Sequence, residues 1–205
     1  MKIKRIFAIT LATTLIGSSV FAFSDIEGHW AKADIEHLQQ EDIVNGYRDG
    51  SFKPNKVINR EEFAMIMFKA INRDNAINPA NHFSDLKEGH WSTAPINYLY
   101  ELGVVKGYPH GEFAPYRLIT RAEVVSIINN FVKDRGLIIR HDPSFSDIRG
   151  HWSEQEVYNL SSYGIINGYT DGTFKPEKFV TRAEVVTMIT KMLKAVEEAD
   201  SYNWQ

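Results

Sequence analysis

The chain has 205 residues, and its 23 basic and 26 acidic residues give it a net charge of −3. It therefore lacks the overall positive charge that binds nucleic acid or an anionic membrane, and nucleic acid is excluded as a partner. The sequence contains no cysteine, which excludes stabilising disulfides and a lipid-modified cysteine anchor.

The first 22 residues have the layout of a secretory signal peptide. A basic start precedes an apolar run over 6–16, which is short for a membrane-spanning helix, and a small residue, Ala22, ends the segment. The alternative is an uncleaved membrane anchor. We expect cleavage after Ala22, which leaves 20 basic and 26 acidic residues and no transmembrane segment in an exported mature chain.

After this segment, one pattern is written three times at a step of 61 residues. Its landmarks are Trp30, Trp91 and Trp152; Gly46, Gly107 and Gly168; Pro54, Pro115 and Pro176; and Arg60, Arg121 and Arg182. A long fixed period indicates an array of supersecondary units. We assign repeat 1 to residues 23–78, repeat 2 to 79–140 and repeat 3 to 141–194. Residues 195–205 form a C-terminal tail, either a frayed end or a contact through Trp204.

Each repeat begins with Phe-Ser-Asp and a His-Trp pair, followed by apolar residues at helical spacing such as Ile35 and Leu38. This pattern predicts a short amphipathic helix of about three turns. Glycine just past the last apolar residue is a common helix end, so these helices should stop near Gly103 and Gly164. The first copy has Asp42 at this position, and we expect its helix to end less tightly.

The second half of each repeat combines a compact loop with a second helix. Asn-Gly and Asp-Gly pairs predict turns with positive φ and at most a short strand pair. Thr120 and Thr181 begin capping boxes with a glutamate three residues on, and Asn59 begins a variant. Apolar stripes at i, i+3, i+4 and i+7 follow, and a lone helix pair cannot bury them. We therefore predict a mainly α fold of three helix-loop-helix repeats packed around a pseudo-threefold axis.

Capping does not explain the arginine at the first position of each second helix, Arg60, Arg121 and Arg182. A helix start favours anions, so a cation there is electrostatically misplaced. Either each guanidinium pairs with a nearby glutamate or opening aspartate, or it joins free helix amides to form a receptor for a carboxylate or phosphate. Lys53 and Lys175 either add charge to the same clefts or are ordinary solvated lysines.

Phe-Ser-Asp, His-Trp, Gly-Tyr-x-Asp-Gly-x-Phe-x-Pro and Thr-Arg-Ala-Glu recur in this order, and the chain resembles the S-layer homology (SLH) domain family. The resemblance covers residues 23 to about 194 and implies a three-pronged helical pseudo-trimer that attaches exported proteins to the cell wall or cell surface. Its implied partner is an anionic wall polysaccharide, often carrying pyruvate ketals, or a peptidoglycan-linked group. In a double-membraned source the location would be the periplasm or outer envelope.

The resemblance assigns Arg121 and Arg182 to the ligand, and Arg60 from a variant Asn-Arg-Glu-Glu motif. Tryptophans at the helix entrances either stack on sugars or anchor the core, which is the more frequent role of a large aromatic residue. The full set of ligand-binding candidates is Arg60, Arg121, Arg182, Lys53, Lys175, Asp25, Asp85, Asp147, Trp30, Trp91 and Trp152. Ala114 and His110 replace charged loop residues in the middle copy, so three clefts of unequal strength are expected.

Competing functions are an enzyme and an adaptor. A glycoside hydrolase would need a carboxylate pair such as Asp85 and Glu123, but the glutamate is engaged in capping. No histidine has a second ligand at chelating spacing, so we expect no catalytic residues, no metal and no cofactor. The alternative function is an envelope assembly or adaptor protein that binds another surface protein through the same surfaces.

Overall fold

The computed structural model describes residues 23–72 and 77–202, so the predicted signal peptide and Trp204 lie outside the described residues. The described part contains α-helices, one short 3-10 helix and isolated β-bridges, with no sheet, which confirms the mainly α class. The helices are α1 (Lys32–Gln40), α2 (Arg60–Ile71), α3 (Thr93–Glu101), η1 (Pro109–Gly111), α4 (Arg121–Val132), α5 (Glu154–Ser162) and α6 (Arg182–Tyr202).

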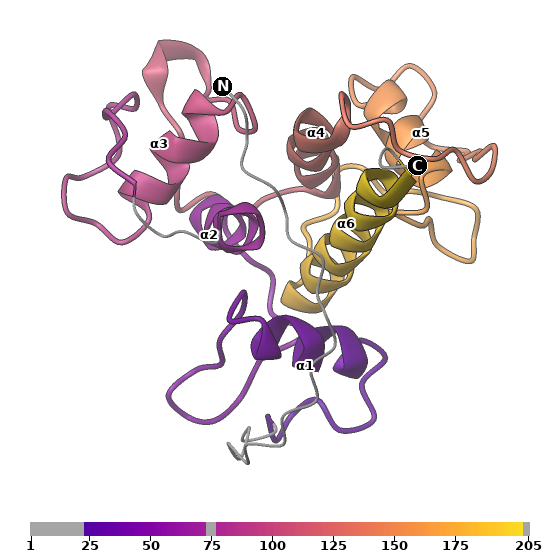
Figure 1. Ribbon diagram of the computed structural model, residues 1–205, viewed down its shortest axis with the longest axis horizontal. Helices are drawn as coiled ribbons and strands as arrows, with labels where there is room; N and C mark the ends of the chain where they lie inside the picture. Colours follow the sequence, from indigo (N-terminus) through magenta and orange to yellow (C-terminus); the bar gives the residue numbers. More distant parts are fainter. Residues whose placement is uncertain (1–22, 73–76, 203–205) are drawn as a thin grey trace.

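The repeats form three prongs around a central group of helices (Figure 1). Helices α2, α4 and α6 lie at the centre, and α1, α3 and α5 lie outside them with their loops. Each outer helix packs on an inner helix of the preceding repeat: α3 on α2, α5 on α4, and α1 on α6. The last pair closes the ring, because the first repeat packs on the third.

A ring of backbone hydrogen bonds surrounds the pseudo-threefold axis. The N–H of Ile58 donates to the carbonyl of Val180, that of Val180 to Ile119, and that of Ile119 to Ile58, each at 3.2 Å. Each donor–acceptor pair joins two different repeats. The three repeats are therefore cyclically equivalent, as the 61-residue step predicts.

The apolar stripes of the inner helices form the core that the spacing predicts. Phe63, Met67, Val124 and Ile128 are fully buried, and so is Ile189 of the third repeat. All three capping arrangements are also confirmed: the side chain of each N-cap residue accepts from the amide three residues on, and the glutamate there accepts the N-cap amide. Helix position and core face thus follow directly from local sequence.

The outer helices end with one residue in the left-handed region, at Asp42 (φ 56°), Gly103 (φ 72°) and Gly164 (φ 77°). The looser end expected at Asp42 is wrong. The amide of Ile43 donates to Leu38 at 2.9 Å, the same distance as the equivalent bonds of Val104 and Ile165. Asp42 adopts the glycine conformation because the buried residue after it must enter the core.

Asp42→Gly is expected to stabilise the protein by about 1 kcal/mol, since a side chain in the left-handed region costs about this much. Glycine stands at both equivalent positions, so the fold accepts it. Urea denaturation measures the change, and Asp42→Ala, which retains a Cβ, is the control without stabilisation. An unchanged or lower urea midpoint for Asp42→Gly would contradict the argument.

Glycine in the Asn-Gly pairs has a different role from the predicted one. Gly46 does not adopt positive φ. Instead a Cβ built on Gly46 would lie 2.2 Å from Cε1 of Phe23 and 2.9 Å from the carbonyl oxygen of Ser51. Gly107 and Gly168 face the equivalent phenylalanine rings at 2.4 and 2.3 Å. These glycines let the opening aromatic ring of each repeat pack directly on the loop backbone.

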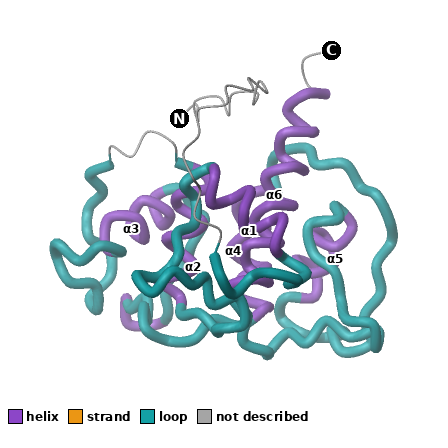
Figure 2. The backbone as a smooth tube through the Cα atoms, turned by 90° about the horizontal axis from the view of Figure 1, so that it is seen from below, coloured by secondary structure: helices purple, strands orange, loops and turns teal. Residues whose placement is uncertain are grey.

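Helix α6 is longer than the other inner helices and includes most of the predicted tail (Figure 2). Val196 and Ala199 are buried on this extension. The segment between repeats 2 and 3 lies beside it, where Arg140 pairs with Glu198 and donates its backbone amide to Ser162 at 2.7 Å. Residues 195–202 are therefore a packed helical end rather than a frayed one.

Candidate functional site

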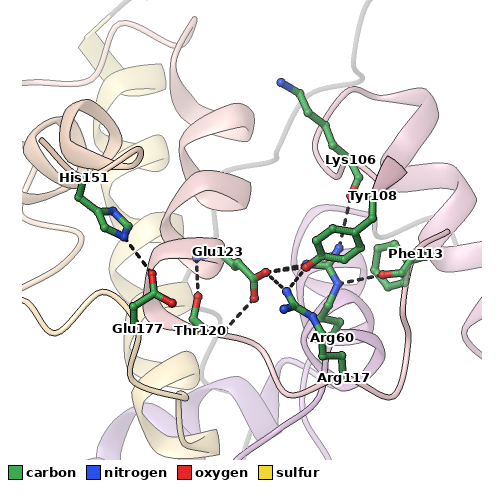
Figure 3. A network of polar contacts seen from close by, with 9 residues as sticks. All are labelled: Arg60, Lys106, Tyr108, Phe113, Arg117, Thr120, Glu123, His151 and Glu177. Carbon is green, nitrogen blue, oxygen red and sulfur yellow. Dashed lines mark hydrogen bonds and ion pairs between the residues drawn. The ribbon is translucent and has the colours of Figure 1, made fainter. Parts of the chain in front are cut away.

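Arg60 lies at the junction between repeats 1 and 2, with its side chain 5% exposed (Figure 3). Its Nε donates to the carbonyl of Phe113 at 2.9 Å, and one terminal nitrogen donates to the carbonyl of Lys106 at 3.3 Å. The other terminal nitrogen lies 3.9 Å from Oε1 of Glu123. The guanidinium therefore joins the start of α2 to the loop and inner helix of the next repeat.

Arg121 and Arg182 repeat this geometry around the ring. Arg121 donates to the carbonyls of Phe174 at 2.8 Å and Asn167 at 3.1 Å. Arg182 donates to the carbonyls of Phe52 at 2.8 Å and Asn45 at 3.0 Å, which closes repeat 3 onto repeat 1. Each guanidinium also lies over the tyrosine and phenylalanine rings of the contacted loop, 4.4 to 5.0 Å from the ring centroids.

The predicted receptor of free helix amides is wrong. The amide of Arg60 donates to the carbonyl of Arg117 at 2.9 Å, and that of Glu61 donates to Pro115 at 3.0 Å. The third amide, of Glu62, is taken by the Asn59 cap. The same bonds recur at α4 and α6. Only the outer edge of each guanidinium is left to meet a ligand, and Arg60 and Arg121 lie 3.9 and 3.7 Å from the capping glutamates of the next repeat, Glu123 and Glu184.

Burial lowers the pKa of all three arginines, partly offset by neighbouring tyrosines and carboxylates. Arginine nevertheless stays protonated in proteins, because its ordinary pKa is far above neutral pH. Each junction thus holds a permanent, partly desolvated positive charge. Two backbone carbonyls and a π face stabilise that charge in place.

A tyrosine, a glutamate and a second cation surround each arginine. In the third repeat, the hydroxyl of Tyr169 donates to Oε1 of Glu184 at 2.8 Å, and Lys178 Nζ lies 2.9 Å from the same oxygen. Burial raises the pKa of Glu184, but hydrogen bonds from Thr181, Lys178 and Tyr169 outweigh it, so the net shift is downward. Glu184 is therefore ionised at neutral pH.

The equivalent groups in the second repeat are Tyr108, Glu123 and Arg117, and in the first Tyr47, Glu62 and Lys56. The hydroxyl of Tyr108 donates to Glu123 at 2.5 Å, and Arg117 contacts both. Burial, followed by the contact with Glu123, raises the pKa of Tyr108, which keeps the phenol protonated. Figure 3 shows Tyr108, Glu123 and Arg117 converging on Arg60 from the neighbouring repeat.

A pocket of about 390 Å³ opens beside Arg60. It is lined by Arg60, Lys106, Gly107, Tyr108, Arg117, Glu123, Ser126, Ile127, Asn130 and Trp152. All three repeats contribute: repeat 1 the arginine, repeat 2 the loop and α4, and repeat 3 the tryptophan. By the 61-residue step, the equivalent set around Arg121 includes Trp30 and Lys191, and that around Arg182 includes Trp91 and Lys69. We call these three places the Arg60, Arg121 and Arg182 clefts.

The Arg60 cleft has three cations and one carboxylate, and the equivalent positions of the other two clefts carry the same numbers, with Asp34 as an additional carboxylate beside Thr187 in the Arg121 cleft. In the Arg121 and Arg182 clefts the third cation is a lysine on the inner helix that faces an asparagine of the loop. The side-chain oxygen of Asn45 accepts from Lys69 Nζ at 3.2 Å, and the side-chain oxygen of Asn167 accepts from Lys191 Nζ at 3.0 Å. In the Arg60 cleft the residue types are exchanged, with Lys106 on the loop and Asn130 on the helix. Each cleft is therefore positively charged in a chain whose net charge is −3.

The three tryptophans are exposed, so the interpretation as core anchors is wrong. Trp30 is 64% exposed, Trp91 50% and Trp152 58%. Each indole lies 5.3 to 5.5 Å, centroid to centroid, from the imidazole of the preceding histidine. The short outer helices bury their apolar face, but the tryptophan precedes that face and points outward. Such a ring is free to stack on a ligand.

The predicted aspartates bind the backbone N–H groups of the loop, whereas the arginines bind its carbonyls. Both carboxylate oxygens of Asp25 accept backbone amides, from Phe52 at 2.8 Å and Lys53 at 2.7 Å. Asp85 and Asp147 do the same in their own repeats. These bonds hold the left-handed residue of the loop, Lys53 at φ 58° in the first copy. Lys53 and Lys175 pair with Asp49 and Asp171 and lie over the cleft tyrosines.

Sequence reasoning missed the cleft tyrosines and their basic partners. The signal was present: Tyr47, Tyr108 and Tyr169 recur at the same step, and a basic residue recurs at 56, 117 and 178. Neither set fits a helix or turn requirement. Their role became visible only when the loop of one repeat was placed beside the arginine of another.

These features define a class: a helical repeat protein closed into a ring, with a cationic and aromatic cleft at each junction. The chain belongs to the S-layer homology domain family, whose sequence profile matches residues 22–64, 82–125 and 144–186. The S-layer is a cell-surface structure, so family membership assigns the chain to the exported, cell-surface class. This confirms the resemblance drawn from the recurring motifs.

Relatives include Cell surface glycoprotein 1 of Acetivibrio thermocellus, 37% identical over 74% of this chain, and the Cellulosome-anchoring protein of that organism, 36% identical over 74%. Exoglucanase XynX of the same organism is 32% identical over 84% of this chain. The matches span only 7%, 35% and 16% of those proteins, respectively. The shared region thus occurs in proteins whose names describe different roles.

Within residues 23–72 and 77–202, no helix is both long enough and apolar enough to cross a membrane.

Proposed function

We propose that this chain attaches non-covalently to the cell wall by binding an anionic wall polysaccharide in its three inter-repeat clefts. The observation that carries the proposal is that each cleft combines two or more cations with an exposed tryptophan, although the chain as a whole is acidic. A carboxylate on a sugar, such as a pyruvate ketal, would pair with the cations while the sugar face stacks on the indole. A peptidoglycan-linked anionic group has the same chemistry.

Three alike clefts suit a repeating ligand. A polymer that occupies one cleft holds its next units at high effective concentration near the others, so weak sites combine into strong attachment. The names of two relatives, a surface glycoprotein and an anchoring protein, support this attachment role.

The carboxylates at the clefts and loops support a non-catalytic function. Glu62, Glu123 and Glu184 serve as helix caps and hydrogen-bond to the cleft tyrosine or its basic partner, and Asp25, Asp85 and Asp147 hold loop amides. A glycoside hydrolase needs one carboxylic acid with a raised pKa and a second, ionised carboxylate, both facing the substrate. In Exoglucanase XynX the shared region covers only 16% of the protein, which leaves room for catalysis elsewhere in that enzyme.

Lys56, Arg117 and Lys178, which we call the rim cations, test this proposal, because their side chains are 43 to 49% exposed and, unlike Arg60, Arg121 and Arg182, are not buried between repeats. We expect Lys56→Gln, Arg117→Gln and Lys178→Gln together to weaken binding about tenfold or more, since hydrogen bonds to charged groups contribute about 1.5 kcal/mol or more each. The measurement is co-sedimentation with Acetivibrio thermocellus walls, before and after removal of secondary polysaccharide.

The matched control is Lys87→Gln, Lys133→Gln and Lys194→Gln, three exposed lysines outside the clefts. This control variant makes the same change in net charge, so it separates the effect of the cleft residues on binding from the effect of the overall charge. Equal loss in both triple variants would count against the cleft proposal. Binding to stripped walls at the level of intact walls would instead favour a peptidoglycan-linked group or another surface protein as the partner.

A further inference from the structure

A second aromatic residue accompanies a tryptophan in one repeat only. In repeat 2, the ring of Tyr116 meets the imidazole of His90 edge to face, with centroids 6.4 Å apart, and His90 lies 5.5 Å from Trp91. Tyr116 is 64% exposed and Trp91 50%. The three rings therefore form a continuous surface strip, which we call the aromatic track.

The other repeats place polar residues at the position of Tyr116. In repeat 1, Asn55 faces His29 with Oδ1 and Nε2 3.3 Å apart. In repeat 3, Glu177 faces His151 with Oε1 and Nε2 2.9 Å apart, as Figure 3 shows. The backbone thus offers the same position beside each histidine, but only repeat 2 fills it with a ring that can stack on a sugar.

The two ends of the track lie at different clefts. Tyr116 stands between Pro115 and Arg117, whose carbonyls accept the backbone amides of Glu61 and Arg60, so it lies beside the start of α2 and next to Arg117 of the Arg60 cleft. Trp91 precedes α3, which packs on α2, as Trp152 precedes α5, which packs on α4. Because Trp152 lines the Arg60 cleft, the 61-residue step assigns Trp91 to the Arg182 cleft. The track therefore runs from the Arg182 cleft to the Arg60 cleft across the surface of repeat 2.

We infer that the aromatic track is a stacking subsite that carries one polysaccharide chain from the Arg182 cleft to the Arg60 cleft. The inference rests on the proposed function and adds a path to it. A flexible polymer loses conformational freedom when it spans two sites, and stacking on the intervening rings offsets part of that loss. In repeat 3, the carboxylate of Glu177 occupies the equivalent place and repels an anionic polymer, so the path is specific to repeat 2.

The test compares two ligands and two variants by isothermal titration calorimetry. The ligands are short and long fragments of secondary wall polysaccharide from Acetivibrio thermocellus, the short ones sized to fill a single cleft. The variant is Tyr116→Asn, which installs the residue of repeat 1 and should fold normally. The control is Tyr202→Asn, because Tyr202 is also 64% exposed but lies at the far end of α6.

We expect Tyr116→Asn to weaken binding of long fragments about fivefold or more, since the span between clefts loses its support, and to leave short fragments unaffected. Tyr202→Asn should match the wild-type chain with both. Unchanged long-fragment affinity in Tyr116→Asn, or an equal loss with both lengths, overturns the track while the proposed function stands. Failure of the wild-type chain to bind either length overturns the proposed function and the track together.

Discussion

Arg182→Ala is expected to lower the free energy of unfolding by about 3 kcal/mol, because two buried hydrogen bonds from a charged group are lost and their carbonyl partners stay buried. Arg182 is 8% exposed, and its bonds to Phe52 and Asn45 join residues 130 and 137 positions apart in the chain. The variant should therefore loosen the closure of repeat 3 onto repeat 1. Urea denaturation followed by circular dichroism measures the change.

Arg182→Lys is the informative companion. A lysine keeps the charge but presents one ammonium group instead of a planar fork, so it cannot donate to both carbonyls in the same geometry. We expect it to recover only a minor part of the lost stability. If Arg182→Ala unfolds at the wild-type urea concentration, the arginine does not hold the repeats together, and its recurrence at the 61-residue step serves the ligand alone.

This structural role changes how binding is tested. Alanine at Arg121 and Arg182 looks from the sequence like a change that removes ligand contacts and leaves the helices intact. The guanidinium groups instead hold the repeats together. Loss of wall binding in such a variant would therefore have two causes, unfolding of the protein and loss of the ligand contact, which a binding assay does not distinguish. The exposed rim cations avoid that ambiguity.

Gly46→Ala is expected to destabilise the protein by about 2 to 3 kcal/mol, as forced overpacking does. The new methyl group would lie 2.2 Å from the Phe23 ring and 2.9 Å from a backbone oxygen, so the opening segment of repeat 1 must move. The shift in thermal midpoint, measured by calorimetry, reports the effect.

Two further variants separate the close approach from backbone strain. Gly50 has φ 78° and open space around its Cβ position, so Gly50→Ala should cost only about 1 to 2 kcal/mol through its left-handed conformation. Phe23→Leu combined with Gly46→Ala should be less destabilising than the sum of the single changes, because the leucine lacks the clashing ring edge. Simple additivity would show that the ring contact is not the cause.

Much of the local structure was predictable because it depends on neighbours in sequence. Thr120 and Glu123 cap α4 whatever surrounds them, and the stripe from Val124 to Phe131 has a helical period that only a core can satisfy. The 61-residue step determined the number of repeats and their equivalence. Tryptophan was harder to place, since Trp152 is apolar enough for a core but lies just before the buried face of α5.

The sequence by itself determined the three repeats, their helices, their caps and the presence of an arginine at each second helix. Only the tertiary structure decided where those arginines point. Each one reaches into the next repeat, and Arg182 of the last repeat reaches back to the first. The partners of Arg182 lie 130 residues or more away in the sequence, so the closure of the ring selects them rather than the adjacent residues. The clefts exist for the same reason: a pocket shared by Arg60, Tyr108 and Trp152 forms only when three distant segments pack together.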